Sequence, residues 1–163
     1  MPKVKGLSHV VLYVNDLDTM VAFYRDVLGL NISHQYPGRM VFMTPGLEVD
    51  DHQIALLKGR EGDAKLIAHI AFRVGAPADV KAYYEQFKAT GVRVDHCVSH
   101  AYVEEGNTVS CYFDDPEGNR LEVYAVVEEA DPEHRGNRAI DLDQDLEAII
   151  AQASGRIPAA VRS

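Results

Sequence analysis

Two stretches of this chain repeat the same order of hydrophobic and polar patterns. In each, a β-rich run precedes a segment whose apolar residues recur at helical spacing, and three further β-rich runs follow. The predicted strands are 6–14, 30–35, 40–44 and 53–57 in the first stretch, and 66–74, 92–98, 108–113 and 121–127 in the second. The predicted helices are 17–28 and 77–88. The pattern therefore predicts two β-α-β-β-β units.

The repeat is a strong guide to architecture, because each unit offers one sheet covered by one helix. We predict an α+β fold in which two β-α-β-β-β modules, residues 1–62 and 63–128, form one domain with a curved mixed sheet around a cleft. The alternative is a ferredoxin-like α+β sandwich that lacks a site.

The C-terminal segment, residues 129–163, differs in character from the repeat. It is acidic and holds a loop near 131–137, followed by a predicted helix over 142–152. The apolar residues of that helix would dock it on the domain or on a second subunit. Residues 157–163 are expected to be loose.

Composition and charge narrow the class of protein. The chain has 163 residues, 47% of them hydrophobic, and a net charge of −9, which argues against nucleic acid and anionic membranes as partners. No apolar run approaches the roughly 20 residues of a transmembrane helix, and the N-terminus lacks the apolar core of a signal peptide. These features predict a cytoplasmic protein, in which Cys97 and Cys111 are free thiols.

A turn near the end of the second unit places one carboxylate in an apolar strand. The sequence 114–120 combines Asp-Pro with Gly-Asn, which predicts a hairpin with a loop of about five residues. A turn centred near Glu117 pairs Tyr112 with Glu122 on one face. Burial of Glu122 is costly unless its carboxylate faces solvent or holds a cation.

Superposition of the two units suggests that the cation is a metal ion. His9 and His69 occupy the first strand of each unit, and Glu122 aligns with Ala55 in the last strand. A lone strand histidine is usually structural, but two at equivalent positions together with a glutamate match the facial triad of non-haem Fe(II) sites. Three ligand positions would remain open, because Ala55 supplies no ligand at the fourth equivalent position.

These motifs resemble those of the vicinal oxygen chelate superfamily, which includes glyoxalase I, fosfomycin-resistance proteins and type I extradiol dioxygenases. The resemblance covers roughly residues 5–127 and is specific for the superfamily. Its carriers are Leu-Ser-His-Val at 7–10, Ala-Phe-Tyr-Arg-Asp-Val-Leu-Gly at 22–29, Ile-Ala-His-Ile-Ala at 67–71 and Asp-Pro-Glu-Gly-Asn-Arg-Leu-Glu at 115–122.

Within the superfamily, three further residues are similar to functional residues of the extradiol dioxygenases. The resemblance implies that His52 is an acid–base group, that His100 contacts the substrate and that Tyr112 hydrogen-bonds a substrate hydroxyl. His52 faces the metal only if it precedes the regular strand or follows a bulge, because strict alternation from Ala55 turns it away. The alternatives are an exposed turn histidine at 52, a loop histidine at 100 and a core tyrosine at 112.

The remaining histidines have no partners that the sequence identifies. His34, His96 and His134 are therefore expected at the surface.

The resemblance implies an Fe(II)- and O₂-dependent extradiol dioxygenase that cleaves a catechol-type aromatic diol, with Mn(II) as an alternative metal. A homodimer is expected, because symmetric dimers are the commonest closed assembly. A glyoxalase I-like isomerase would need a fourth carboxylate where Ala55 stands. A fosfomycin-type thiol transferase would need cationic residues near Tyr112, to which Arg73 could contribute. A non-enzymatic binding protein would not need His9, His69 and Glu122 together.

Overall fold

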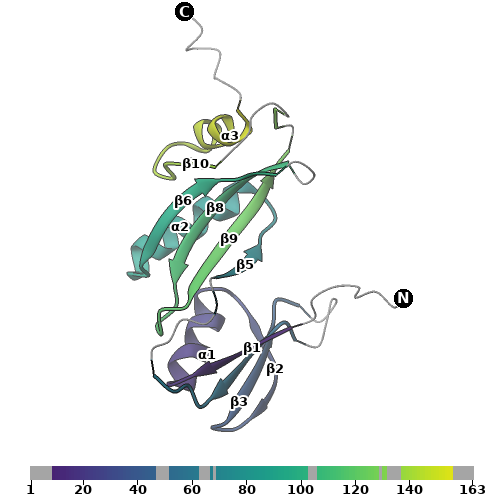
Figure 1. Cartoon of the computed structure of the whole chain (residues 1–163), viewed down its shortest axis with the longest axis vertical. Coiled ribbons are helices and arrows are strands. Elements are labelled where there is room, and N and C mark those ends of the chain that lie inside the picture. The colour runs from purple at the N-terminus through teal and green to yellow at the C-terminus, as the bar shows by residue number, and fades with distance from the viewer. Residues whose placement is uncertain are drawn as a thin grey trace, which may run out of the picture. The chain divides into compact units, whose positions relative to one another are not determined.

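The computed structural model describes residues 9–46, 52–62, 67, 69–102, 106–128, 130–131 and 137–155. The chain consists of two compact units, Met1–Leu66 and Ile67–Ser163 (Figure 1). Each unit combines a sheet with helices, which confirms the predicted α+β class with two related modules.

The first unit is a four-stranded sheet with one helix. The strands have the order β1-β4-β3-β2, in which β1 and β4 are parallel and the other pairs are antiparallel. Its elements are β1 (Val10–Val14), α1 (Leu17–Asp26), β2 (Asn31–Tyr36), β3 (Met40–Thr44) and β4 (Ile54–Lys58).

Capping and burial explain the position of α1. The Asp16 side chain accepts a hydrogen bond from the Thr19 backbone N–H at 3.0 Å, which satisfies a free donor at the start of the helix. Met20 and Tyr24 lie one turn apart on the inner face and are fully buried. Gly29, at φ +72°, turns the chain toward β2.

The second unit repeats this plan and adds to it. Its sheet has the order β10-β6-β8-β9-β5, and β7 pairs with β8. As in the first unit, the first strand of the module is parallel to the last, here β5 to β9. The elements are β5 (Ile70–Arg73), α2 (Pro77–Thr90), β6 (Val94–Ser99), β7 (Ala101–Tyr102), β8 (Gly106–Asp114), β9 (Arg120–Val127), β10 (Arg138–Ala139) and α3 (Leu146–Ser154).

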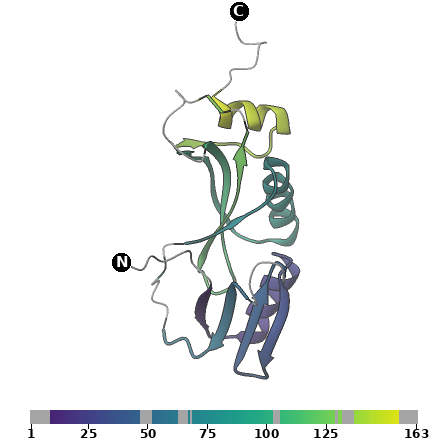
Figure 2. The same cartoon turned by 90° about the vertical axis from the view of Figure 1, so that its right-hand side faces the viewer.

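Both helices of the second unit pack on one face of its sheet (Figure 2). Phe87 of α2 contacts Phe113 of β8 with ring centroids 4.3 Å apart, and both side chains are fully buried. Asn107, on the same face of β8 by strand alternation, donates from Nδ2 to the Ala153 carbonyl of α3 at 2.7 Å. The opposite face of β8 and β9 carries Tyr112 and Glu122.

The structure differs from the predicted elements mainly in the C-terminal segment. The last helix begins at Leu146 and not at 142, because the Asp145 side chain caps it by accepting from the Ala148 N–H at 2.8 Å. The short strands β7 and β10 were not predicted, because two residues carry no usable alternation. Residues 6–8 of the first predicted strand lie outside the described residues.

Among the described residues, the structure contains no helix with the length and apolar character needed to cross a membrane.

Candidate active site

The strand registers give the two units a common set of positions. In the first unit, Val11 of β1 pairs with Ala55 of β4, and in the second, Ala71 of β5 pairs with Glu122 of β9. The equivalence of Ala55 and Glu122 predicted from the sequence is therefore confirmed. Each histidine precedes its strand residue by two positions, so strand alternation directs His69 toward the face of Glu122.

The second unit brings an imidazole and a carboxylate together. The His69 Nε2 atom lies 3.4 Å from the Glu122 Oε2 atom. The Glu122 side chain is only 7% exposed, whereas that of His69 is 40% exposed. The carboxylate is therefore nearly buried, with a histidine as its neighbour on the solvent side.

Tyr112 lies beside this pair, as the hairpin predicted. It is the direct cross-strand partner of Glu122, and its ring centroid lies 5.4 Å from that of His69 in an edge-to-face arrangement. Its hydroxyl is 3.0 Å from the Nε2 atom of His100. His100, which the sequence left in an unassigned loop, thus joins the same cluster.

The C-terminal segment also reaches this cluster. The Nδ1 atom of His100 lies 3.0 Å from the Oδ1 atom of Asn137. Because Oδ1 can only accept a hydrogen bond, this contact gives the proton of neutral His100 to Nδ1. In that tautomer the Nε2 atom is an acceptor, to which the Tyr112 hydroxyl can donate. No pattern in the sequence places Asn137 near this cluster.

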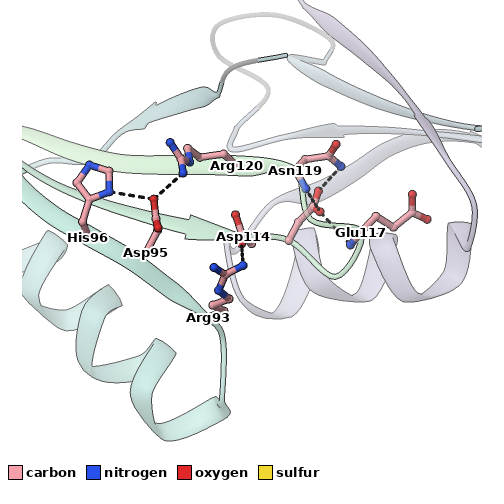
Figure 3. Close-up of polar contacts among 8 residues, drawn as sticks. Arg93, Asp95, His96, Asp114, Glu117, Asn119 and Arg120 are labelled. Carbon is pink, nitrogen blue, oxygen red and sulfur yellow. Dashed lines mark hydrogen bonds and ion pairs between the residues drawn. The ribbon is translucent and has the colours of Figure 1, made fainter. Parts of the chain in front are cut away.

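His96 lies at the surface, as expected, and it also has partners that the sequence did not identify. Its ring stacks on that of Tyr112 with centroids 4.5 Å apart and planes at 10°. Its Nδ1 atom lies 3.0 Å from the Asp95 carboxylate, which also accepts from Arg120 at 2.7 Å (Figure 3). This network holds an imidazole flat against the tyrosine ring.

The equivalent histidine of the first unit also has partners. His34 pairs with Phe42 across β2 and β3 as His96 pairs with Tyr112, and its ring contacts that of Phe42 at 5.7 Å. In both units a register shift immediately precedes the histidine. That irregularity breaks simple alternation, so the two histidines could have been matched only by aligning the repeats. His134 lies outside the described residues.

The first unit places His9 beside His52. Their ring centroids are 4.5 Å apart, and the His52 ring also contacts Phe42 at 4.8 Å. His52 precedes β4 rather than forming part of it, which is the condition under which it could turn toward His9. The pair gives the first unit two imidazoles in direct contact.

A loop with several internal hydrogen bonds connects the two strands that carry Tyr112 and Glu122. Asp115 is almost fully buried, and its Oδ1 atom accepts from the backbone N–H groups of Glu117 at 3.0 Å and Asn119 at 2.8 Å. Its Oδ2 atom accepts from the Asn119 side-chain amide at 2.7 Å (Figure 3). The loop spans five residues, as predicted, and it fixes the register of the hairpin.

The residues predicted as metal ligands are only partly brought together within either unit. Among the residues that the structure describes, no group of three His, Cys, Asp or Glu side chains is placed to hold an ion. The second unit holds the predicted ligands His69 and Glu122, and the first holds the predicted ligand His9, whose ring contacts that of His52. As far as the described residues go, either unit alone therefore provides at most part of a three-ligand site.

Comparison with known proteins identifies relatives over most of the chain. The sequence profile of the Glyoxalase/Bleomycin resistance protein/Dioxygenase superfamily matches residues 6–123. Biphenyl-2,3-diol 1,2-dioxygenase 3 of Rhodococcus globerulus is 32% identical over 135 residues, which cover 76% of this chain and 67% of that protein. Manganese-dependent 2,3-dihydroxybiphenyl 1,2-dioxygenase of Geobacillus genomosp. 3 is 29% identical over 77% of this chain, but the match spans only 38% of that protein.

Solved structures of similar fold include proteins with other activities in their names. Lactoylglutathione lyase from Agrobacterium tumefaciens has a TM-score of 0.58 at 27% identity, covering 76% of this chain and 96% of that one. A mutant fosfomycin resistance protein from Listeria monocytogenes, complexed with Mn(II), has a TM-score of 0.60 at 25% identity, covering 78% and 94%.

Proposed function

The chain belongs to the Glyoxalase/Bleomycin resistance protein/Dioxygenase superfamily, and from that membership we propose that it is an extradiol dioxygenase. It would cleave the ring of a catechol-type aromatic diol beside the two hydroxyls, with Fe(II) as cofactor and O₂ as co-substrate. Several relatives are named as dioxygenases of aromatic diols, which supports this choice within the superfamily.

One observation carries the proposal: His69 and Glu122 face each other while the Tyr112–His100 pair lies on the same side of the sheet. The first pair offers metal ligands, and the second offers hydrogen-bonding groups for a substrate hydroxyl. A site that binds metal and hydroxyl side by side suits a diol.

The donor set fits a divalent first-row metal. Imidazole nitrogen and carboxylate oxygen both bind such ions at about 2.0–2.2 Å, so two cis ligands lie about 3 Å apart. The 3.4 Å separation of His69 Nε2 and Glu122 Oε2 is close to that value. In the proposal His9 completes the set, and the ion would supply Lewis-acid activation of the diol and an open position for O₂. Mn(II) suits the same ligands, and one relative is named as manganese-dependent.

The protein's own side chains would orient the diol and move its protons. Tyr112 would hydrogen-bond one hydroxyl, with its ring in contact with the rings of His96 and His69. His52, in contact with His9, would act as the general base that takes a proton from the diol and returns it later. His100 would hold the Tyr112 hydroxyl through the 3.0 Å contact and, as the resemblance implies, would contact the substrate.

The test is oxygen uptake after anaerobic reconstitution with Fe(II), using a panel of catechols. Consumption of O₂ together with the colour of a ring-cleaved semialdehyde supports the proposal. His34→Gln is a matched control for the histidine variants, because His34 is an exposed strand histidine outside the proposed machinery. Absence of uptake with every diol in iron-loaded protein would contradict the proposal.

The structural likeness to a lactoylglutathione lyase makes isomerisation the second candidate. Ala55 argues against it, because it occupies the position equivalent to Glu122 with a methyl group that is fully buried. Turnover of methylglyoxal–glutathione with Ni²⁺ or Zn²⁺, without O₂, would favour the isomerase.

We further propose that the protein forms a symmetric homodimer. Light scattering, which measures the molar mass in solution, would test this.

A further inference from the structure

Asn137 lies outside the residues that the superfamily profile matches, yet it contacts the cluster around Tyr112. Its position follows from strand register. Arg138 and Ala139 of β10 pair with Ser99 and Val98 of β6 in antiparallel fashion. One step further along this ladder sets Asn137 opposite His100, where antiparallel neighbours place their side chains on one face.

The C-terminal segment holds that register firmly. The ladder continues through the Ile140 N–H, which donates to the Cys97 carbonyl at 3.1 Å. Beyond it, Lys81 Nζ donates to the Leu142 carbonyl at 2.8 Å, and Lys88 pairs with Asp143 at 2.6 Å. These contacts tie the segment that carries Asn137 to α2 and β6 of the second unit.

We propose that Asn137 is a positioning residue that determines which way the Tyr112 hydroxyl points its proton. Asn137 Oδ1 accepts from Nδ1–H of His100, so His100 Nε2 carries a lone pair and accepts from the Tyr112 hydroxyl. The single proton of that hydroxyl then points at the Nε2 atom of His100. Toward a bound ligand, Tyr112 presents only oxygen lone pairs.

The orientation of the Tyr112 hydroxyl would affect which substrate group it binds, an inference that rests on the proposed function. A tyrosine that can only accept selects a ligand group that donates, such as the free hydroxyl of a diol. With the opposite His100 tautomer, Nε2–H would donate to the Tyr112 oxygen, and the tyrosine proton would point at the ligand. A donating tyrosine would prefer an ionised or alkylated oxygen. Asn137 therefore acts on the substrate through two intervening side chains.

The tautomer can be measured directly by NMR on the full-length, metal-free protein labelled with ¹⁵N-histidine. The spectra are recorded at about pH 8, where an ordinary imidazole is neutral. His100→Gln identifies the His100 signals by their loss. We expect wild-type His100 to carry its proton on Nδ1, and Asn137→Ala to shift it toward a mixture of tautomers. Asn137→Asp keeps an acceptor at the same atom and should restore the Nδ1–H form.

Asn31→Ala is the matched control, because Asn31 is an exposed asparagine on β2 of the other unit. It should leave the His100 signals unchanged. A wild-type protein with the proton on Nε2 would overturn the proposal. So would an Nδ1–H form that persists in Asn137→Ala, because another group would then be holding the tautomer.

Turnover of the iron-loaded protein provides a second readout. Loss of an orienting partner behind a metal site typically costs about 10-fold to 100-fold in activity. We expect a fall of that size in kcat for Asn137→Ala at unchanged iron content, with recovery in Asn137→Asp. Equal kcat in Asn137→Ala and wild type would overturn the positioning role. A protein with the expected tautomer and no oxygen uptake would refute the proposed function alone.

Discussion

Ala55 and Glu122 occupy the same register position in the two copies of the module. Ala55 pairs with Val11, two residues after His9, and Glu122 pairs with Ala71, two residues after His69. The carboxylate is present in one copy only. With the proposed triad, this asymmetry leaves the metal three protein ligands, so the remaining positions are available to small molecules.

Glu122→Gln should abolish tight metal binding while preserving the fold. The amide has nearly the same shape but lacks the charge that attracts a divalent cation to a nearly buried position. Loss of this ligand should weaken metal affinity by at least about 10-fold to 100-fold, the range typical even for outer partners of a metal site. Calorimetric titration with Mn(II) measures it. Glu128→Gln is the control, because Glu128 is an exposed glutamate that directly follows β9. This variant should bind Mn(II) as the wild type does.

His52→Gln should slow turnover and leave the iron content unchanged. General acid–base assistance is worth about 10²–10⁴-fold, and glutamine cannot exchange a proton at neutral pH. Steady-state oxygen uptake gives the rate, and a colorimetric iron assay gives the occupancy. If His52→Gln loses its iron, His52 is a ligand and the acid–base role is wrong.

Asp115→Ala should destabilise the second unit through the hairpin loop. The substitution removes an acceptor of three hydrogen bonds and leaves two backbone N–H groups without that partner. Hydrogen bonds to a charged group contribute about 1.5–3 kcal/mol each and are not additive, so we expect a loss of about 2–4 kcal/mol in the free energy of unfolding. Urea titration measures this loss. Asp114→Ala, which removes a single surface ion pair with Arg93, should cost far less (Figure 3).

Cys97 should react with alkylating agents well before Cys111. The two residues are direct cross-strand partners, and both are free thiols, as the sequence predicted. The Cys111 thiol donates to the Cys97 sulfur, which lowers the pKa of Cys97. The same hydrogen bond, together with burial, raises the pKa of Cys111.

The pH dependence of Cys97 alkylation follows from the lowered pKa of the Cys97 thiol. Because only the thiolate reacts, the alkylation rate of Cys97 should rise with pH at lower values than for an ordinary thiol. Cys111→Ala removes the donor and should move this rise to higher pH. Mass spectrometry of iodoacetamide-treated protein measures both sites. Faster labelling of Cys111 than of Cys97 would contradict the assignment of donor and acceptor.

Local pattern and turn chemistry predicted the features of the fold on which the candidate site depends. The Asp-Pro and Gly-Asn pairs fixed the hairpin loop, and its length paired Tyr112 with Glu122. Alignment of the repeats matched Glu122 to Ala55, and the structure agrees because in each unit the first strand pairs in parallel with the last.

Contacts that depend on irregular or distant backbone were not predictable in the same way. The register shift before His96 hides its relation to Tyr112 from any count of alternating residues. The contact of His100 with Asn137 depends on a two-residue strand that pairs 39 positions away, between Arg138 and Ser99. No hydrophobic period marks so short an element.

Strand β10 lies along the outer edge of β6, beyond the part of the chain that matches the superfamily profile. A shortened protein that stops at Val127 would leave the backbone groups of β6 open to pairing with other molecules, and it would uncover the apolar surface under α3. Trimming this chain to the size of its compact relatives therefore invites aggregation. The segment that protects the sheet from other copies of itself is also the one that delivers Asn137 to His100.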